Sequence, residues 1–167
     1  MWIQNEAGAS PGEATSGDSL LFAEWSGTEY LAPLTLWSGQ KGILNLSFAA
    51  DTAGEGYVVF AVDEDGDPDT KVDRELYALS TAEGAWQAAT RLTDDTAEDA
   101  VPVLVAVNGT PICVWSAGGT VSYTPLEEWS PKAVYAEYTT ANEAVSLDGV
   151  ALPGGAVIAY TVQGAEG

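Results

Sequence analysis

The chain has 167 residues, of which 46% are hydrophobic, enough to fill the core of one folded domain. It carries 25 acidic and 5 basic residues, a net charge of −20, which excludes partners bound by neutralising phosphates, such as nucleic acids and anionic membranes. No apolar run approaches the ~20 residues of a membrane span, and the first residues lack the basic and apolar regions of a signal peptide.

One sequence unit recurs three times along the chain. Each copy has an aromatic residue, a small residue two positions later and an apolar residue six positions later, and the copies begin at Tyr30, Trp86 and Trp129. Each copy follows a short apolar stretch and precedes a polar loop and two more apolar stretches. A long period filled with short strands predicts a single repeat domain over residues 1–167, with units at about 6–62, 75–116 and 120–162.

The strands of the second copy favour a propeller over a sandwich. Residues 100–107 (AVPVLVAV) and 111–115 (PICVW) are apolar at successive positions, as expected of strands buried on both faces. Asn108-Gly109 between them is a favoured two-residue hairpin turn, and Gly154-Gly155 occupies the same place in the third copy. We therefore expect an all-β, β-propeller-like fold of about three four-stranded antiparallel blades.

The densest chemical feature is the acidic segment 63–75, between two predicted strands. Aspartates alternate along a turn-forming backbone, and two further carboxylates lie close enough to complete an oxygen shell for calcium. The predicted ligands are Asp63, Asp65, Asp67, Asp69, Asp73 and Glu75. The match to an EF-hand loop is partial, because Pro68 stands where glycine is needed and Arg74 where the bidentate glutamate is needed. The alternative is a solvated acidic turn neutralised by Lys71 and Arg74.

Two other features favour structural roles. The acidic run 93–99 lacks alternating aspartates and is typical of a solvated turn that caps a strand. Cys113 is the only cysteine, so it forms no internal disulfide, and its apolar neighbours predict a buried strand residue rather than a reactive thiol.

These repeats resemble the blades of sialidase-type, Asp-box-related propellers and of the large bacterial and archaeal surface proteins built from them. The resemblance rests on the Trp-x-Ala/Pro strands, the Leu-Thr-Asp-Asp-Thr loop at 92–96 and the segment 80–86 (STAEGAW). That segment is similar to the Asp-box turn but lacks its aspartate and is one residue short. The resemblance implies the fold and does not imply sialidase chemistry.

The residue inventory argues against catalysis. The chain has no histidine, so Ser-His-Asp and Cys-His arrangements and His-ligated zinc are excluded. Sialidases grip the substrate carboxylate with three arginines, whereas this chain has only Arg74 and Arg91. No pattern in the sequence pairs two carboxylates for glycoside hydrolysis. We expect that the chain is not an enzyme.

Two functions from different classes remain open. The first is a structural or assembly segment of an extracellular or cell-surface protein, stabilised by calcium; its acidity suits a cation-rich setting, although ordinary solubility explains it equally well. The alternative is a module that binds a glycan or protein through exposed aromatic residues such as Trp25, Trp37 or Trp129. Two or more of these side chains lining an open pocket would favour the alternative.

The phase of the repeat leads to an assembly hypothesis. Aligning Trp2, Ala61, Trp115 and Tyr160 places both the first and the last residues of the sequence at the end of a blade. Three blades are fewer than the ~4 to 8 that close a propeller. We therefore expect self-association or a place within a larger propeller protein, with residues 2–5 completing the blade that ends near Tyr160 in a neighbouring copy or in the same chain.

Overall fold

The computed structural model describes residues 1–5, 17–39, 41–67, 69–129, 132–133 and 144–162. All regular structure in these residues is β-strand, and the strands pair antiparallel, so the predicted all-β class is confirmed. Parts of the first and third predicted repeat units, at 6–16, 40, 130–131 and 134–143, lie outside the described residues, whereas the second unit, 75–116, lies wholly within them. The number of blades stays a prediction, because the described sheets differ in size and none of them is closed.

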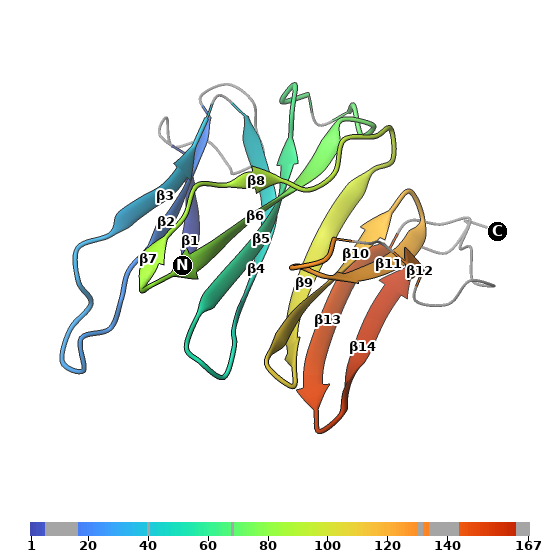
Figure 1. The fold of residues 1–167 in the computed structure, drawn as a ribbon. Helices are drawn as coiled ribbons and strands as arrows, with labels where there is room; N and C mark the ends of the chain where they lie inside the picture. Colours follow the sequence, from blue (N-terminus) through green and yellow to red (C-terminus); the bar gives the residue numbers. More distant parts are fainter. Residues whose placement is uncertain (6–16, 40, 68, 130–131, 134–143, 163–167) are drawn as a thin grey trace.

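The described strands form four sheets, which we number I to IV in chain order (Figure 1). Sheet I holds β1 (Trp2–Asn5), β2 (Asp18–Phe22) and β3 (Leu34–Ser38). Sheet II holds β4 (Gly42–Ala50), β5 (Gly56–Asp63), β6 (Arg74–Ala82), β7 (Ala85–Trp86) and β8 (Thr90–Arg91). Sheet III holds β9 (Asp99–Val107), β10 (Thr110–Ala117), β11 (Thr120–Pro125) and β12 (Lys132–Ala133). Sheet IV holds β13 (Ala144–Leu152) and β14 (Gly155–Val162).

Three apolar layers join the four sheets in series. The first layer joins sheets I and II, the second joins II and III, and the third joins III and IV. Strand β5 explains the series, because Val58 and Phe60 pack toward sheet I whereas Val59 and Ala61 pack toward sheet III. Successive side chains of a strand point to opposite faces, so an unbroken apolar run is what a strand buried on both faces requires.

Strand β9 lies at the centre of this series. It contacts β4, β5 and β6 of sheet II on one side and β13 and β14 of sheet IV on the other. Strands β4, β9 and β13 are each at the edge of their own sheet and lie next to one another (Figure 1). The first strand of each long hairpin therefore meets its counterparts in the neighbouring sheets.

The hairpin turns follow the sequence signals closely. Asn108 and Gly109 both have positive φ, at 52° and 87°, which confirms the predicted turn between β9 and β10. In sheet IV the turn residues are Pro153 and Gly154, whereas Gly155 pairs with Leu152 as the first residue of β14. The predicted Gly154-Gly155 turn is thus displaced by one residue.

The first strand pairs within its own chain. Strand β1 pairs with β2, with Asn5 opposite Asp18. Among the described strands, β14 pairs only with β13. Pairing of residues 2–5 with a strand near Tyr160, in the same chain, is therefore not observed, and pairing between copies stays a prediction.

Candidate metal centre

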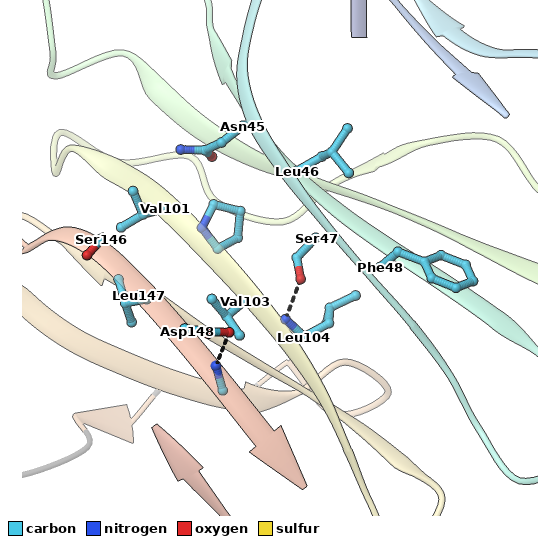
Figure 2. A pocket seen from close by; sticks show the side chains of 12 residues that line it. Asn45, Leu46, Ser47, Phe48, Val101, Val103, Leu104, Ser146, Leu147 and Asp148 are labelled. Carbon is cyan, nitrogen blue, oxygen red and sulfur yellow. Dashed lines mark hydrogen bonds between the residues drawn. The ribbon is translucent and has the colours of Figure 1, made fainter. Parts of the chain in front are cut away.

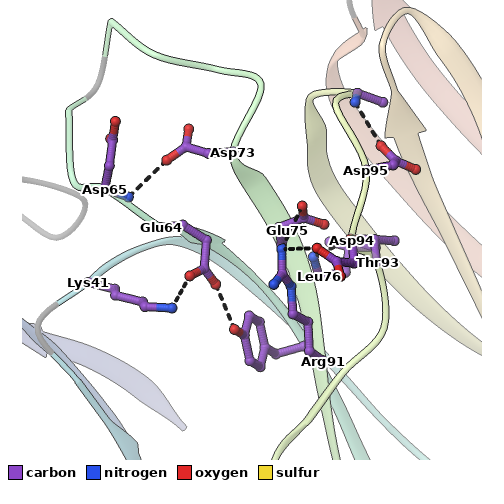
Figure 3. A network of polar contacts seen from close by, with 12 residues as sticks. Lys41, Glu64, Asp65, Asp73, Glu75, Leu76, Arg91, Thr93, Asp94 and Asp95 are labelled. Carbon is purple, nitrogen blue, oxygen red and sulfur yellow. Dashed lines mark hydrogen bonds and ion pairs between the residues drawn. The ribbon is translucent and has the colours of Figure 1, made fainter.

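The loop between β5 and β6 is folded by its own aspartates (Figure 3). The Gly66 N–H donates to Asp63 Oδ1 at 2.7 Å, and the Asp67 N–H donates to Asp65 Oδ1 at 2.8 Å. The Asp69 N–H donates to Asp67 Oδ1 at 3.0 Å. Side chains that accept from backbone two or three residues ahead stabilise successive tight turns, which is why an Asp-rich segment forms a compact loop here.

Three of the six predicted ligands come together in this loop. One carboxylate oxygen each of Asp63, Asp65 and Asp73 lies within 4.8 Å of the other two. Asp73 closes the loop, because its Oδ2 accepts from the Asp65 N–H at 2.8 Å (Figure 3). Asp63 is fully buried, Asp73 is half-buried and Asp65 is exposed, so the group runs from the interior to the surface. Such a group can hold a hard cation through carboxylate oxygens.

Two oxygens of the cluster are buried without a hydrogen bond. They are Asp63 Oδ2 and Asp73 Oδ1. Buried polar atoms are nearly always satisfied, so such atoms call for a water, an ion or a charged neighbour. The Arg74 Nε lies 3.6 Å from Asp63 Oδ2 and supplies part of that charge.

The electrostatics of Asp63 reflect this crowding. Burial raises the pKa of the Asp63 carboxyl, the charges of Asp73 and Asp65 raise it further, and the Gly66 hydrogen bond and Arg74 oppose the rise. A cation would lower this pKa, because it favours the ionised carboxylate. The site therefore gains from a positive charge beyond the one that Arg74 provides.

Arg74 is shared with the neighbouring acidic loop. Its Nη1 pairs with Glu98, and Lys71 Nζ lies 3.5 Å from the other oxygen of Glu98. The loop at 64–73 is thereby attached to the loop that leads into β9. Lys71 and Arg74 thus take part in ion pairs, as the solvated-turn alternative requires, although one of their partners, Glu98, belongs to the next loop.

The other three predicted ligands lie outside the cluster. Asp67 and Asp69 are exposed, and Asp67 uses one oxygen to hold the Asp69 N–H. Glu75 is only 1% exposed, and its Oε1 accepts from Arg91 Nη2 at 2.8 Å (Figure 3). Glu75 follows Arg74 in β6, so alternation along the strand turns it to the opposite face from Arg74.

The second acidic run is more buried than its sequence indicates. Thr93 accepts from the Leu76 N–H at 2.9 Å, and Arg91 bridges Glu75 and Asp94 (Figure 3). Asp94 and Asp95 are exposed, as predicted for a solvated turn.

The sequence pattern did not predict that Asp99, at the end of this run, is a polar residue of the core. It is 1% exposed, and its Oδ1 accepts from the Trp115 indole N–H at 2.8 Å. Burial raises the pKa of Asp99 to about 6, while hydrogen bonds from Thr93 and Trp115 oppose the rise. The available signal was an aspartate directly before an apolar strand with a tryptophan in the next strand.

The three tryptophans proposed for ligand binding do not share a pocket. Trp37 packs in the layer between sheets I and II, with its ring 5.5 Å from that of Phe60. Trp129 stacks on Trp115 at 5.2 Å in the layer between sheets II and III. Trp25 is 54% exposed and contacts Tyr30 edge to face. Two of the three therefore contribute to the core.

No protein-family model matches this chain, and no curated protein sequence matches it either. In the described part of the chain, no helix has the length and apolar character needed to cross a membrane.

Proposed function

We propose that this chain is a non-catalytic segment of β-propeller type from an extracellular or cell-surface protein, in which it serves as a structural and assembly unit. The observation that carries the proposal is the series of three apolar layers between four antiparallel sheets. Blades of a propeller stack face to face in this way, with their innermost strands adjacent. The positions of β4, β9 and β13 are consistent with innermost strands.

The end sheets support a role in assembly. Sheet IV is two-stranded, and Val150, Leu152 and Val157 are exposed on it. At the other end of the series, Trp2 of sheet I is exposed. Exposed apolar residues of this kind mark surfaces that another sheet covers, either in a second copy or in the rest of a larger propeller protein.

Light scattering over a range of concentrations, with and without calcium, tests this part of the proposal. A mass above 17.3 kDa that increases with calcium or salt supports self-assembly, because cations screen the net charge of −20. A stable monomer under all conditions removes self-assembly and leaves the role within a larger protein.

We further propose that the loop at 63–73 binds calcium through Asp63, Asp65 and Asp73. Calcium takes ~6 to 8 oxygens, so backbone carbonyls or waters would complete the shell. Arg74 already neutralises part of the site, so we expect weak binding, with a Kd of about 10⁻⁴ to 10⁻³ M, the range of extracellular modules.

Thermal unfolding with calcium, magnesium and chelator tests the calcium site. With a Kd of about 1 mM, about 10 mM calcium stabilises the folded chain by about 1.4 kcal/mol, a rise in Tm of roughly 3 to 6 °C. Asp73→Asn keeps an acceptor for the Asp65 N–H but removes one charge of the cluster, so it should lose most of this rise.

Asp69→Asn is the matched control for this experiment. It lies in the same loop outside the cluster and should keep the full rise in Tm with calcium. No rise in the unsubstituted chain would favour the solvated turn. A rise lost in Asp69→Asn but kept in Asp73→Asn would mean that a different set of aspartates binds the ion.

A further inference from the structure

A small pocket lies between sheets II and III. Sheet II supplies one wall from β5, β6 and the segment that contains β8, and the turn that follows β11 supplies the other. The pocket has a volume of about 290 Å³, near the lower end of the ~300 to 1,000 Å³ of small-molecule sites.

Strand pairing places four lining side chains on one face of sheet II. Tyr57 lies opposite Ser80, and Ala78 lies opposite Thr90. Residues directly opposite each other in antiparallel strands share a face of the sheet. Tyr57 and Ala78 belong to the apolar layer between sheets II and III, so this is the face that looks toward sheet III.

The facing wall is a turn that the fold holds in place. The Leu126 N–H donates to the Pro111 carbonyl of β10 at 3.0 Å. Trp129, at the end of the same turn, stacks on Trp115 of β10 at 5.2 Å. The turn that carries Glu127 is therefore fixed to sheet III on both sides of that residue.

Sheets II and III are also joined outside the pocket. The Ser47 hydroxyl of β4 accepts from the Leu104 N–H of β9 at 2.9 Å, and Figure 2 shows this bond in the wall of a larger hollow along β4, β9 and β13. Because both walls belong to sheets that are held together, the smaller pocket does not depend on a loop that closes over it.

Part of the pocket wall is apolar. Ala78, Leu92 and Leu126 line it, and all three also pack in the layer between sheets II and III. These side chains offer a surface against which a short hydrocarbon chain can be removed from water.

Carboxylates stand at the polar end of the pocket. Glu127 lines it and is exposed. Asp51 Oδ2 lies 3.5 Å from the Tyr57 hydroxyl, while Asp51 Oδ1 accepts from the N–H groups of Ala53 and Glu55 at 2.8 and 2.9 Å. The Asp51 carboxylate is thus held by the backbone of the β4–β5 turn, next to the Tyr57 side chain.

The negative charge near Tyr57 is not balanced by a basic side chain. Burial raises the pKa of the Tyr57 hydroxyl, and the charges of Asp51, Glu127 and Glu55 raise it further. Among the described residues, no lysine or arginine lines the pocket or forms an ion pair with any of these three carboxylates. A positive charge is therefore favoured at this end of the pocket, and an anion is repelled.

The uncharged polar groups of the pocket can accept hydrogen bonds from such a cation. Gln87 Nε2 donates to the Ala85 carbonyl at 2.9 Å, which leaves Gln87 Oε1 as an acceptor. The hydroxyl oxygens of Tyr57, Ser80 and Thr90 are further acceptors in the wall. A bare calcium ion suits the pocket less well, because it takes ~6 to 8 oxygens and Glu127 is the one carboxylate among the described lining residues.

We infer that this pocket binds a small organic cation, an ammonium or guanidinium group on a short aliphatic stem, with the charge near Tyr57 and Glu127 and the stem against Leu92 and Leu126. The cation can be a free amine or a lysine or arginine side chain of another protein. The pocket shares no residue with the calcium loop and is formed by one chain, so the inference depends on neither calcium nor assembly.

Titration of the ¹⁵N-labelled full chain with butylammonium in calcium-free buffer, followed by ¹H–¹⁵N correlation spectra, tests the inference. A ligand of so few atoms binds weakly, so the titration extends to about 100 mM. Butylammonium should give saturable shifts at the Gln87 side-chain amide and the Ser80 N–H. Butanol and butyrate, which have a chain of the same length, should bind at least about tenfold more weakly. Raising the salt from about 20 mM to about 500 mM should weaken butylammonium binding, because salt screens the carboxylates.

The peptide acetyl-Gly-Lys-Gly-amide distinguishes the two sources of the cation. Tighter binding of the peptide than of butylammonium supports a side chain of another protein as the ligand. Tighter binding of butylammonium supports a free amine. Either result supports a cation site.

Glu127→Gln tests the residue, and Glu128→Gln is the matched control. Both residues are exposed and lie in the same turn, and both substitutions remove one negative charge, but Glu128 does not line the pocket. Glu127→Gln should weaken butylammonium binding about threefold or more, in keeping with an exposed charge pair. Glu128→Gln should bind as the unsubstituted chain does, and the same spectra report folding.

Four results would each overturn the inference. They are no saturable shifts with butylammonium, shifts confined to another surface, binding of butanol or butyrate as tight as that of butylammonium, and equal effects of Glu127→Gln and Glu128→Gln. The last of these would mean that the cation responds only to the net charge of the chain. None of them bears on the calcium loop, whose test uses other residues and another ion.

Discussion

Replacing Asp99 by asparagine should change how the stability of the chain depends on pH. The carboxyl is 1% exposed and accepts from the Trp115 indole, and burial raises its pKa from 3.8 to about 6. A carboxyl with a raised folded-state pKa binds its proton more readily in the folded chain than in the unfolded chain. Its protonation therefore stabilises the fold as the pH falls through about 6, and the gain is complete below about 4.

The size of the effect follows from the two pKa values. Between about pH 7.5 and about pH 4.5, preferential protonation of Asp99 adds about 2 kcal/mol to the free energy of unfolding. Asp99→Asn keeps an oxygen for the Trp115 N–H but cannot titrate, so this component is absent. The negative charges of Asp95 and Glu75 contribute to the raised pKa of Asp99 in the unsubstituted chain.

Urea unfolding followed by tryptophan fluorescence at about pH 4.5, 6 and 7.5 measures the difference. The unsubstituted chain should gain about 2 kcal/mol more than Asp99→Asn on acidification. Equal pH dependence in the two proteins, or a steeper gain in the variant, would refute a buried carboxyl with a raised pKa at this position.

Three further outcomes test the packing. Phe60→Ala, in the layer between sheets I and II, should cost about 3 to 5 kcal/mol of unfolding free energy in urea, whereas exposed Phe48→Ala should cost far less; similar costs would contradict the burial pattern. Asn108→Val forces a β-branched residue to a φ of 52° and should lower stability by about 1 to 2 kcal/mol by the same assay, and no loss would contradict the turn geometry. Burial raises the pKa of the Cys113 thiol, so a thiol-reactive dye should label it only in urea, and rapid labelling of the folded chain would contradict its burial.

The strands could be predicted from sequence because apolar runs and glycine turns are local signals. The register of the strands could not be predicted in this way. The alignment of the repeat units, for example, treats Ala61 and Trp115 as equivalent residues. The two residues pack in the same layer from opposite sheets, so they face each other, whereas equivalent residues of sheets stacked in series face the same way. A slip of one residue reverses the face of a side chain, and strands apolar on both faces give no pattern that reveals the slip.

The sequence was enough to predict an acidic metal-binding loop, but not which of its carboxylates come together. Alternating aspartates indicated a metal loop, and the cluster of Asp63, Asp65 and Asp73 supports one. Spacing could not show that Asp67 is used within the turn or that Glu75 points to the other face of β6. Those outcomes depend on hydrogen bonds of the folded loop and on where β6 begins.

The pocket between sheets II and III could not be predicted from the sequence. Tyr57 and Glu127 are far apart in the chain and share the pocket only because the two sheets stack. The turn that carries Glu127 is placed by contacts of its neighbours with Pro111 and Trp115, which no local pattern specifies.

A crystal structure of the chain grown with calcium would test the central claim most directly. The account predicts an ion in the β5–β6 loop, with oxygens of Asp63, Asp65 and Asp73 at about 2.3 to 2.6 Å, and sheets that remain stacked in the order I to IV. A loop without an ion at millimolar calcium, or an ion held by Asp67, Asp69 or Glu75 instead, would contradict it.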